Sequence, residues 1–243
     1  EWLKAYCNKD AVVILPAYPL PELKEALQGL GFHTFIETQS GVPVRHGGLS
    51  IVVEALTAPT DGPIGDSALL IDDGVERLLN LNDSRPTDPD RLLVQGAIDI
   101  CLLQFSGAIW YPMVYEQDPT TKLNLARAKV ESQFARAIKY VESLDARAVV
   151  PSAGPPCFLD EDLFHLNMIT GNETSIFPDQ TKFLERLSAL GRTNDILAIP
   201  GTAIDISTKK TTVSSPKNID IPEIFANKEN YLRQYQADWS AWL

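Results

Sequence analysis

The feature that most constrains the fold is a change in the spacing of apolar residues along the 243-residue sequence. Residues 32–82 contain several short apolar runs typical of strands, with almost no helical spacing between them. From residue 98 onward a strand at 98–104, a long amphipathic helix at 122–144 and a strand at 147–150 follow one another. Strands that alternate with helices form a sheet covered by helices, because each element must bury an apolar face. The sequence therefore predicts a sheet-rich α/β sandwich with helices on the outside.

Shorter patterns flank this core. They predict a helix end at 1–8, a strand at 11–15, a helix at 20–30, hairpins at 41–56 and within 57–86, a helix at 177–190, a short strand at 196–199, and an exposed hairpin or loop at 203–218. The β-branched run at 11–15 is typical of a strand buried on both faces. The final pattern, 227–243, predicts a helix whose aromatic face packs on its own or a neighbouring domain rather than on a cofactor. No convincing boundary interrupts the chain, so a single domain over 1–243 is predicted.

Composition limits the function classes. The formal net charge of −11 argues against nucleic acid or an anionic membrane as the main partner, but a local basic pocket can still bind a small anionic substrate. No apolar run approaches the roughly 18 residues of a membrane span. The three cysteines are far apart and form no C-x-x-C motif, which favours free thiols in the cytoplasm. The chain opens at Glu1 in the middle of a helical pattern, so we expect further sequence upstream.

Polar residues gather at four predicted strand ends: Asp61–Asp66, Asn80–Arg85, Ser106–Tyr111 and Ser152–Cys157. In α/β folds, binding sites form outside the ends of strands, where several loops meet. Carboxylates such as Asp66 and Asp83 are natural ligands of a divalent cation. Arg85 could clamp a phosphate or carboxylate, although an ordinary salt bridge to a nearby aspartate explains it equally well.

The candidate nucleophiles and histidines are less specific. Ser106 lies in S-G-A rather than in the G-x-S-x-G motif of serine hydrolases. Cys157 follows two prolines and is more typical of a structural cysteine than of a catalytic thiol. The three histidines show neither H-x-H nor H-E-x-x-H, so the sequence contains no self-sufficient zinc site. His165 is the best candidate for a site histidine, with a packed histidine as the alternative.

The motifs together resemble the metallo-β-lactamase fold family. The resembling segments are Gly65-Asp66-Ser67, Asn80-Leu81-Asn82-Asp83, Gln104 to Ala108 with Tyr111-Pro112, and Ser152 to Phe158. More narrowly, they resemble the branch related to CMP-N-acetylneuraminate hydroxylase and N-acylphosphatidylethanolamine phospholipase D. In bacterial members of that branch this domain is often joined to a Rieske iron–sulfur domain.

The resemblance implies an αββα sandwich with metals at one edge of its two sheets. It gives Asp83 the role of the aspartate that bridges two metals and makes Asp66 a neighbouring acid. Asp61 falls near a position where the family often has a histidine ligand, and the last ligand position falls near Ser152. The family's H-x-H-x-D-H motif and the Rieske C-x-H motif are both missing from this sequence. Either the chain lacks its N-terminal portion, which the start at Glu1 favours, or this member has lost its metal centre.

Three functions follow as hypotheses. The first is a metal-dependent hydrolase acting on a small or phosphorylated substrate, in which bound zinc or iron lowers the pKa of an attacking water. The second is the substrate and metal domain of a Rieske-linked oxidoreductase, with the iron–sulfur cluster elsewhere in the protein. The third is a metal-free interaction module. The assigned residues are Asp83, Tyr111 and His165 for catalysis, Arg85, Ser106, Ser152 and Cys157 for substrate binding, and Asp61, Asp66 and Asp83 for metal.

Overall fold

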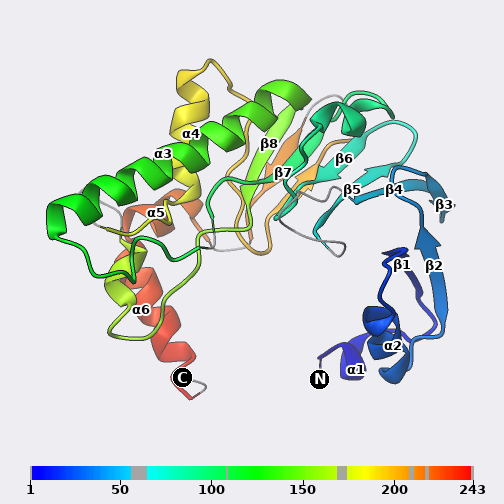
Figure 1. Cartoon of the computed structure of the whole chain (residues 1–243), viewed down its shortest axis with the longest axis horizontal. Coiled ribbons are helices and arrows are strands. Elements are labelled where there is room, and N and C mark those ends of the chain that lie inside the picture. The colour runs from blue at the N-terminus through cyan, green and yellow to red at the C-terminus, as the bar shows by residue number, and fades with distance from the viewer. Residues whose placement is uncertain are drawn as a thin grey trace. The chain divides into compact units, whose positions relative to one another are not determined.

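A computed structural model describes residues 2–55, 65–107, 109–168, 174–207, 211–216 and 219–241. The chain divides into two compact units, residues 1–99 and 100–243 (Figure 1). The prediction that both form one domain stays a prediction. No helix of the described residues combines the length and the apolar character that a membrane span requires.

The first unit begins with a parallel strand pair. Helix α1 (Trp2–Tyr6) precedes β1 (Val12–Pro16), and α2 (Glu22–Gly29) connects β1 to β2 (Thr34–Thr38). The two strands pair in register from Val12 opposite Thr34 to Pro16 opposite Thr38. The expectation that this first strand is buried on both faces is wrong, because only Leu15 is buried in β1. The reason is that β1 and β2 form a sheet of only two strands, which leaves the other residues of β1 partly exposed.

Four antiparallel strands follow, as the strand-rich sequence between 32 and 82 predicts. They are β3 (Val44–His46), β4 (Leu49–Ala55), β5 (Ser67–Asp72) and β6 (Arg77–Asn80), each paired with the next. Gly47 and Gly48 form the two-residue turn between β3 and β4, with φ of 56° and 84°. Both residues of such a turn need positive φ, which glycine adopts without strain. The 3₁₀-helix η2 (Pro89–Leu93) closes this unit.

The second unit contains a parallel β–α–β arrangement. Strand β7 (Ile100–Gln104) leads through α3 (Pro119–Leu144) to β8 (Ala148–Ser152), and Ile100 to Gln104 pair with Ala148 to Ser152. Asp118 caps the start of α3, and its side chain accepts a hydrogen bond from the Thr121 amide at 3.0 Å. Asp145 caps the end of the helix and has the left-handed φ of 42°. These elements match the strand–helix–strand pattern predicted from residue 98 onward.

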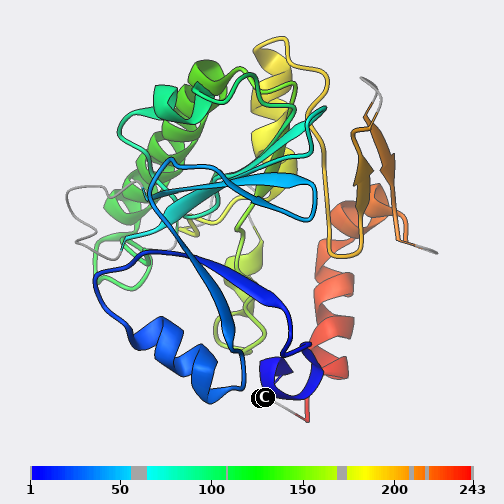
Figure 2. The same ribbon diagram turned by 90° about the vertical axis from the view of Figure 1, so that its right-hand side faces the viewer.

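The remaining elements of this unit are shorter. They are η3 (Phe164–Asn167), α4 (Gln180–Ala189), the antiparallel hairpin of β9 (Ala203–Asp205) and β10 (Thr212–Ser214), α5 (Ile221–Ala226) and α6 (Lys228–Asp238), as Figure 2 shows from a second direction. The predicted strand at 196–199 is wrong. The Ile196 amide donates a hydrogen bond to the Val149 carbonyl at 2.9 Å, but residues 196–199 form no strand. Helix α5, which is only six residues long, was not predicted.

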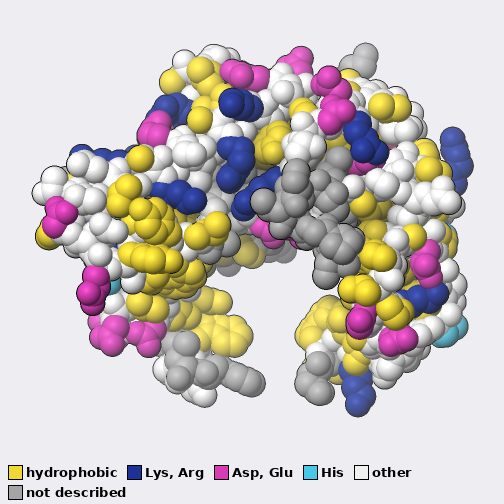
Figure 3. Space-filling view, in the orientation of Figure 1, with side chains coloured by type: hydrophobic (Ala, Val, Ile, Leu, Met, Phe, Trp, Pro, Cys, Tyr) yellow, Lys and Arg dark blue, Asp and Glu magenta, His cyan; other side chains and the backbone are white. Residues whose placement is uncertain are grey.

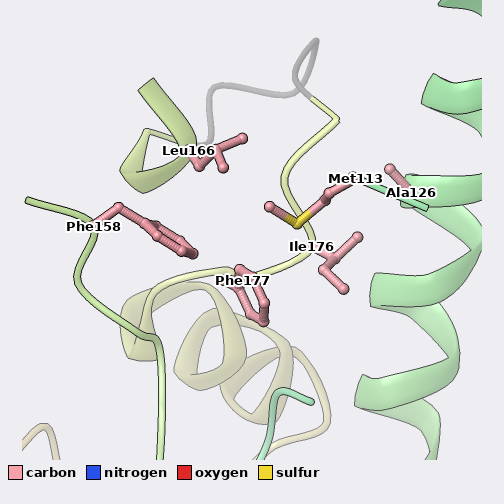
Figure 4. Packing of buried hydrophobic residues seen from close by; sticks show 6 residues of the cluster. All are labelled: Met113, Ala126, Phe158, Leu166, Ile176 and Phe177. Atoms are coloured by element: carbon pink, nitrogen blue, oxygen red, sulfur yellow. The ribbon is translucent and has the colours of Figure 1, made fainter. Parts of the chain in front are cut away.

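Two groups of apolar side chains hold the second unit together. The rings of Phe105, Phe134 and Phe183 pack against one another, with centroids 5.2 to 6.5 Å apart, and so join the end of β7 to α3 and α4. A second cluster packs the loop segments against α3 (Figure 4); it contains Met113, Ala126, Phe158, Leu166, Ile176 and Phe177. Aromatic pairs of this geometry stabilise a core beyond the area that they bury.

Candidate functional site

The carboxyl edge of β7 and β8 brings two predicted substrate-binding residues to one place. Gln104 lies opposite Ser152 in the parallel pair, so the residues after both strands share an edge. Ser106 is 1% exposed, and its hydroxyl has no hydrogen-bond partner within the described residues. A Cβ at Gly154 would lie 2.3 Å from Ser106 Oγ. The backbone after β8 therefore packs directly on this hydroxyl.

The loop after β7 is held by a residue that the sequence did not single out. Gln133 of α3 is buried, and its amide accepts a hydrogen bond from the Gly107 N–H at 3.1 Å and donates one to the Ile176 carbonyl at 3.2 Å. A Cβ at Gly107 would lie 2.7 Å from this amide. Gln133 thereby fixes Ser106-Gly107 against the helix. In the sequence, Gln133 is one polar residue of an amphipathic helix, so no local signal identified it.

Aromatic residues follow this loop on the surface. The Trp110 ring packs edge-on against Phe158, at a centroid distance of 5.2 Å, and against Phe177, at 6.1 Å. Tyr111, a predicted catalytic residue, is 38% exposed, and its ring lies 5.1 Å from that of Tyr115. Figure 3 shows hydrophobic side chains gathered over the loops below the N-terminal half of α3 in this view. This surface suits the apolar part of a substrate better than a charged group.

Asn167 holds together the segments that carry Cys157 and His165. Its side chain is buried; Oδ1 accepts from the Phe158 amide at 2.8 Å, and Nδ2 donates to the carbonyls of Phe158 at 2.7 Å and Phe164 at 2.9 Å. The Ser175 hydroxyl donates to the Leu166 carbonyl at 2.8 Å. The Phe158 and η3 segments, nine residues apart in sequence, are therefore fixed side by side (Figure 4).

Neither Cys157 nor His165 is buried. Cys157 is exposed, but the protein around its sulfur raises the pKa of the thiol, against a smaller opposing effect from the Lys228 charge. A thiol with a raised pKa stays protonated at neutral pH, so Cys157 is not an activated nucleophile. His165 lies exposed in η3, and its carbonyl accepts from the Met168 amide at 3.2 Å.

The final helix docks on this region through polar residues. Lys228 Nζ donates to the Asn167 carbonyl and pairs with Asp179, both at 2.5 Å. The Arg233 guanidinium lies 3.6 Å from the Phe164 ring centroid. Of the aromatic residues that were expected to pack, Tyr231 and Tyr235 of α6 and Trp239 just after it are 38 to 46% exposed. The helix thus docks on its own unit through Lys228 and Arg233, and the packing of its aromatic face stays a prediction.

The acidic candidates belong to the first unit. Asp66 lies just before β5 and Asp83 shortly after β6, and the pairing of Leu69 with Asn80 places both positions at the same open end of the hairpin. Both are exposed, and Asp83 has a left-handed φ of 38°. Arg85 is half-buried in the same segment. Asp61 lies outside the described residues.

These acids do not complete a metal site. Within the described ranges, no group of three or more His, Cys, Asp or Glu residues is placed to hold a metal ion. Asp66 and Asp83 offer suitable oxygen ligands, but a catalytic zinc site normally has three protein ligands. His33 and His46 lie at exposed positions of the first unit. The residues described do not fit a complete metal centre, and the assignments of Asp61, Asp66 and Asp83 as ligands stay predictions.

Comparison with solved structures identifies the class of fold. The chain is similar to a possible metal-dependent hydrolase from Veillonella parvula, with a TM-score of 0.51 and 10% identity, over 83% of this chain and 69% of that chain. A metallo-β-lactamase-fold protein from Bacillus subtilis aligns with a TM-score of 0.44 and 15% identity, over 83% of this chain and 66% of that chain. The mixed sheets and helices described above, together with the likeness to the Veillonella parvula protein, confirm the predicted α/β fold class. At these identities the likeness concerns the fold alone.

The curated relatives are closer in sequence. A protein from Mycolicibacterium smegmatis is 46% identical over an alignment of 244 positions, which covers 97% of this chain and 46% of that protein. One from Mycobacterium tuberculosis is 47% identical over an alignment of 220 positions, which covers 88% of this chain and 42% of that protein. Both are named, provisionally, as Rieske 2Fe-2S iron–sulfur proteins. The chain thus spans about half the length of the curated relatives it matches, and no family model matches it.

Proposed function

We propose that this chain is the substrate-binding part of a Rieske-type iron–sulfur oxidoreductase, built on a metallo-β-lactamase-like fold. The observation that carries the proposal is the 46% identity, over 97% of the chain, to a relative named for a Rieske 2Fe-2S cluster. A sugar-nucleotide hydroxylase is the nearest example of such chemistry among the families that the sequence motifs resemble. The proposal places the protein in the cytoplasm, where the free thiols of Cys7, Cys101 and Cys157 are expected.

The cluster itself would be bound by another part of the full-length protein. A Rieske cluster needs two cysteine and two histidine ligands. This sequence has three cysteines and three histidines but no C-x-H motif. The relatives are about twice as long as the stretch that they share with this chain, which leaves room for a cluster-binding domain in a protein of their length.

The residues of this chain would bind and orient a small-molecule substrate at the carboxyl edge of β7 and β8. The Ser106 hydroxyl, buried and without a partner in the described residues, would hydrogen-bond to a polar group of the substrate, as would Ser152. Trp110 and Tyr111 would contact its apolar part, and the Tyr111 phenol or His165 would transfer a proton. Cys157, as a protonated thiol, would contribute a weak hydrogen-bond donor.

Within the first unit, Arg85 is proposed to bind an anionic group, and Asp61, Asp66 and Asp83 are proposed as metal ligands. A zinc or iron ion, if bound, would supply the activation of water or oxygen. Because the described donors do not complete a site for it, the proposed role of this chain is substrate binding. The remaining metal ligands would have to come from residues outside those described.

The test is the cofactor content of the full-length protein, purified without oxygen. We expect about two iron atoms and two labile sulfides per chain, a visible absorption spectrum from thiolate-bound iron, and an EPR signal on reduction. Stoichiometric zinc without labile sulfide would instead support a metal-dependent hydrolase. If the protein, expressed with an ample supply of metal, contains neither an iron–sulfur cluster nor zinc, both enzyme hypotheses are refuted. The metal-free interaction module is then the remaining hypothesis.

A further inference from the structure

Five large apolar side chains are exposed close together in the loop between β7 and α3. They are Ile109, Trp110, Tyr111, Val114 and Tyr115, at 38 to 63% exposure. Single exposed apolar residues are common on protein surfaces, but a contiguous group marks a site of interaction. Trp110 and Tyr111 are assigned above to the substrate. The other three, Ile109, Val114 and Tyr115, are called the loop surface below.

The backbone beneath the loop surface is fixed. Pro112 and Met113 are buried, and Met113 belongs to the apolar cluster that packs on α3. The Met113 amide donates to the Trp110 carbonyl at 2.7 Å, and the Tyr115 amide donates to the Pro112 carbonyl at 3.1 Å. The buried pair thus anchors the loop, with exposed apolar residues on either side of it. A surface held in this way loses little conformational freedom when a partner binds.

The charges of this loop are negative. Glu116 and Asp118 follow the loop surface, and both are exposed. The loop contains no lysine or arginine. A partner that carries positive charge opposite these carboxylates is therefore favoured over one that carries negative charge.

The neighbouring segment adds further acids. The ring of Phe158 packs on this loop, and exposed Asp160 and Asp162 follow it. Between them, Glu161 is paired with Arg233. Figure 3 shows Asp and Glu side chains along the lower left border of the hydrophobic group. The loop surface thus has the form of an interface with an apolar centre and a charged rim.

The relatives indicate what covers such a surface. The chain aligns with only 46% and 42% of their lengths, so more than half of each relative lies outside the shared stretch. Under the proposed function, that part binds the Rieske cluster. A cofactor acts on a substrate only when the protein positions the two close together. The loop surface is in the right place, because the ring of Tyr115 lies 5.1 Å from that of Tyr111.

We propose that the loop surface docks the cluster-binding part of the full-length protein beside the substrate held by Trp110 and Tyr111. This inference rests on the proposed function. The docking face of the partner is apolar at its centre, where it contacts Val114 and Tyr115. Its lysine or arginine residues lie opposite the acids around the loop surface. Docking also shields the substrate from water, because it covers the exposed side of the loop.

The test is photo-cross-linking of the full-length protein with p-benzoylphenylalanine in place of Tyr115 and, in a second variant, in place of Val114. Leu190, which follows α4 and is 55% exposed, is the matched control position. Mass spectrometry identifies the peptide that is joined to each position after irradiation. From positions 114 and 115 we expect cross-links to peptides outside these 243 residues, several-fold more often than from position 190. The yield should fall as salt is raised, because salt screens the charged rim.

A mixture of isotope-labelled and unlabelled protein shows whether a cross-link joins one chain or two. Cross-links between two copies, cross-links confined to residues 1–243, and equal yields at all three positions each overturn the proposal. A yield that salt does not lower overturns the charged rim of the partner. Circular dichroism shows whether each variant is folded, and the Val114 variant decides if the Tyr115 variant is not.

Iron and sulfide analysis of the same samples separates this inference from the proposed function. A protein that contains the cluster but gives no such cross-links overturns the docking alone. Cross-links in a protein that contains no cluster support the loop surface as a docking site and refute the oxidoreductase.

Discussion

At the scale of single residues, two buried serines of the second unit differ in one respect that can be measured. Ser175 donates a hydrogen bond to the Leu166 carbonyl, whereas the Ser106 hydroxyl has no partner in the described residues. Removing a satisfied buried hydroxyl costs about 1 kcal/mol, but removing an unsatisfied one costs little or even stabilises. We expect urea unfolding to show a loss of about 1 kcal/mol for Ser175→Ala and none for Ser106→Ala.

The Ser106→Ala variant also tests the role of this residue. If the hydroxyl is kept for a substrate, the variant should lose turnover while its free energy of unfolding stays at the wild-type value. A loss of stability equal to that of Ser175→Ala would mean that Ser106 has a structural partner in the folded protein.

The pKa values of the cysteine thiols predict how the rate of their alkylation depends on pH. Burial raises the pKa of Cys101 to about 12, and partial burial raises that of Cys157. Because the thiolate is the reactive form, we expect iodoacetamide to modify exposed Cys157 slowly at pH 7, with a rate that still rises with pH above the ordinary cysteine value of about 8.5. Cys101 should stay unmodified until the protein unfolds. A rate at Cys157 that levels off below pH 8 would contradict the raised pKa.

At the scale of elements, the N-terminus of α3 depends on Asp118. Its bonds to Thr121 lower the pKa of the carboxyl group, so the ionised form is the stabilising one. The contribution is complete above the unfolded value of about 3.9 and is lost as the pH falls through the lower folded value. We expect Asp118→Ala to lower the melting temperature at pH 7, and the difference from wild type to shrink below pH 4.

Asp118→Asn is the matched variant, because asparagine also caps helices but does not titrate. Its melting temperature should stay closer to that of the wild type at pH 7. A difference between wild type and Asp118→Ala that is the same at pH 7 and pH 3 would show that the charge of Asp118 plays no part.

The segment around Phe158 depends on Asn167 in the same way. Asn167→Ala removes three hydrogen bonds and leaves buried backbone groups of Phe158 without partners. Each unsatisfied buried group costs about 1–3 kcal/mol, so we expect a loss of about 3 kcal/mol in urea unfolding. Asn230→Ala, at an exposed position of α6, should change stability by less than about 0.5 kcal/mol. Equal effects of the two variants would contradict the role of Asn167.

At the scale of the whole molecule, the single domain predicted from the sequence implies one cooperative transition. In a Trp2→Phe variant the remaining tryptophans all belong to residues 100–243, so tryptophan fluorescence reports on the second unit, whereas far-UV circular dichroism reports on both units. If residues 1–99 and 100–243 unfold together, the two signals should give the same urea midpoint. Separate midpoints would show that the two compact units are independent domains.

Local patterns predicted most of the elements, because hydrophobic periodicity depends on neighbouring residues. The strand–helix–strand order of β7, α3 and β8 and the glycine turn at 47–48 follow directly from such patterns. The prediction that β1 is buried on both faces was wrong, because the burial of a strand depends on how many strands pair beside it. Gln133 could not be found, since its partners Gly107 and Ile176 lie far along the chain. Asn167 could not be found, because its bonds to Phe158 and Phe164 depend on how the loop between them folds.

The resemblance to a known family predicted some site residues that periodicity could not predict, but it did not predict a complete site. It singled out Asp66 and Asp83, which lie at the same end of the β5–β6 hairpin. It could not supply the remaining metal ligands, because the histidine motif that would provide them is missing from this sequence.

The hydrogen bond from the Phe158 amide to Asn167 has a consequence for exchange with solvent. Amide hydrogens in loops usually exchange with deuterium within seconds, because no ladder or helix protects them. The Phe158 amide lies in a loop, but it is buried and bonded to Asn167, whose own carbonyl is bound by Lys228 of α6. Its exchange therefore requires the opening of the η3 segment and the start of the last helix, so this loop amide should be protected as strongly as the interior of a strand.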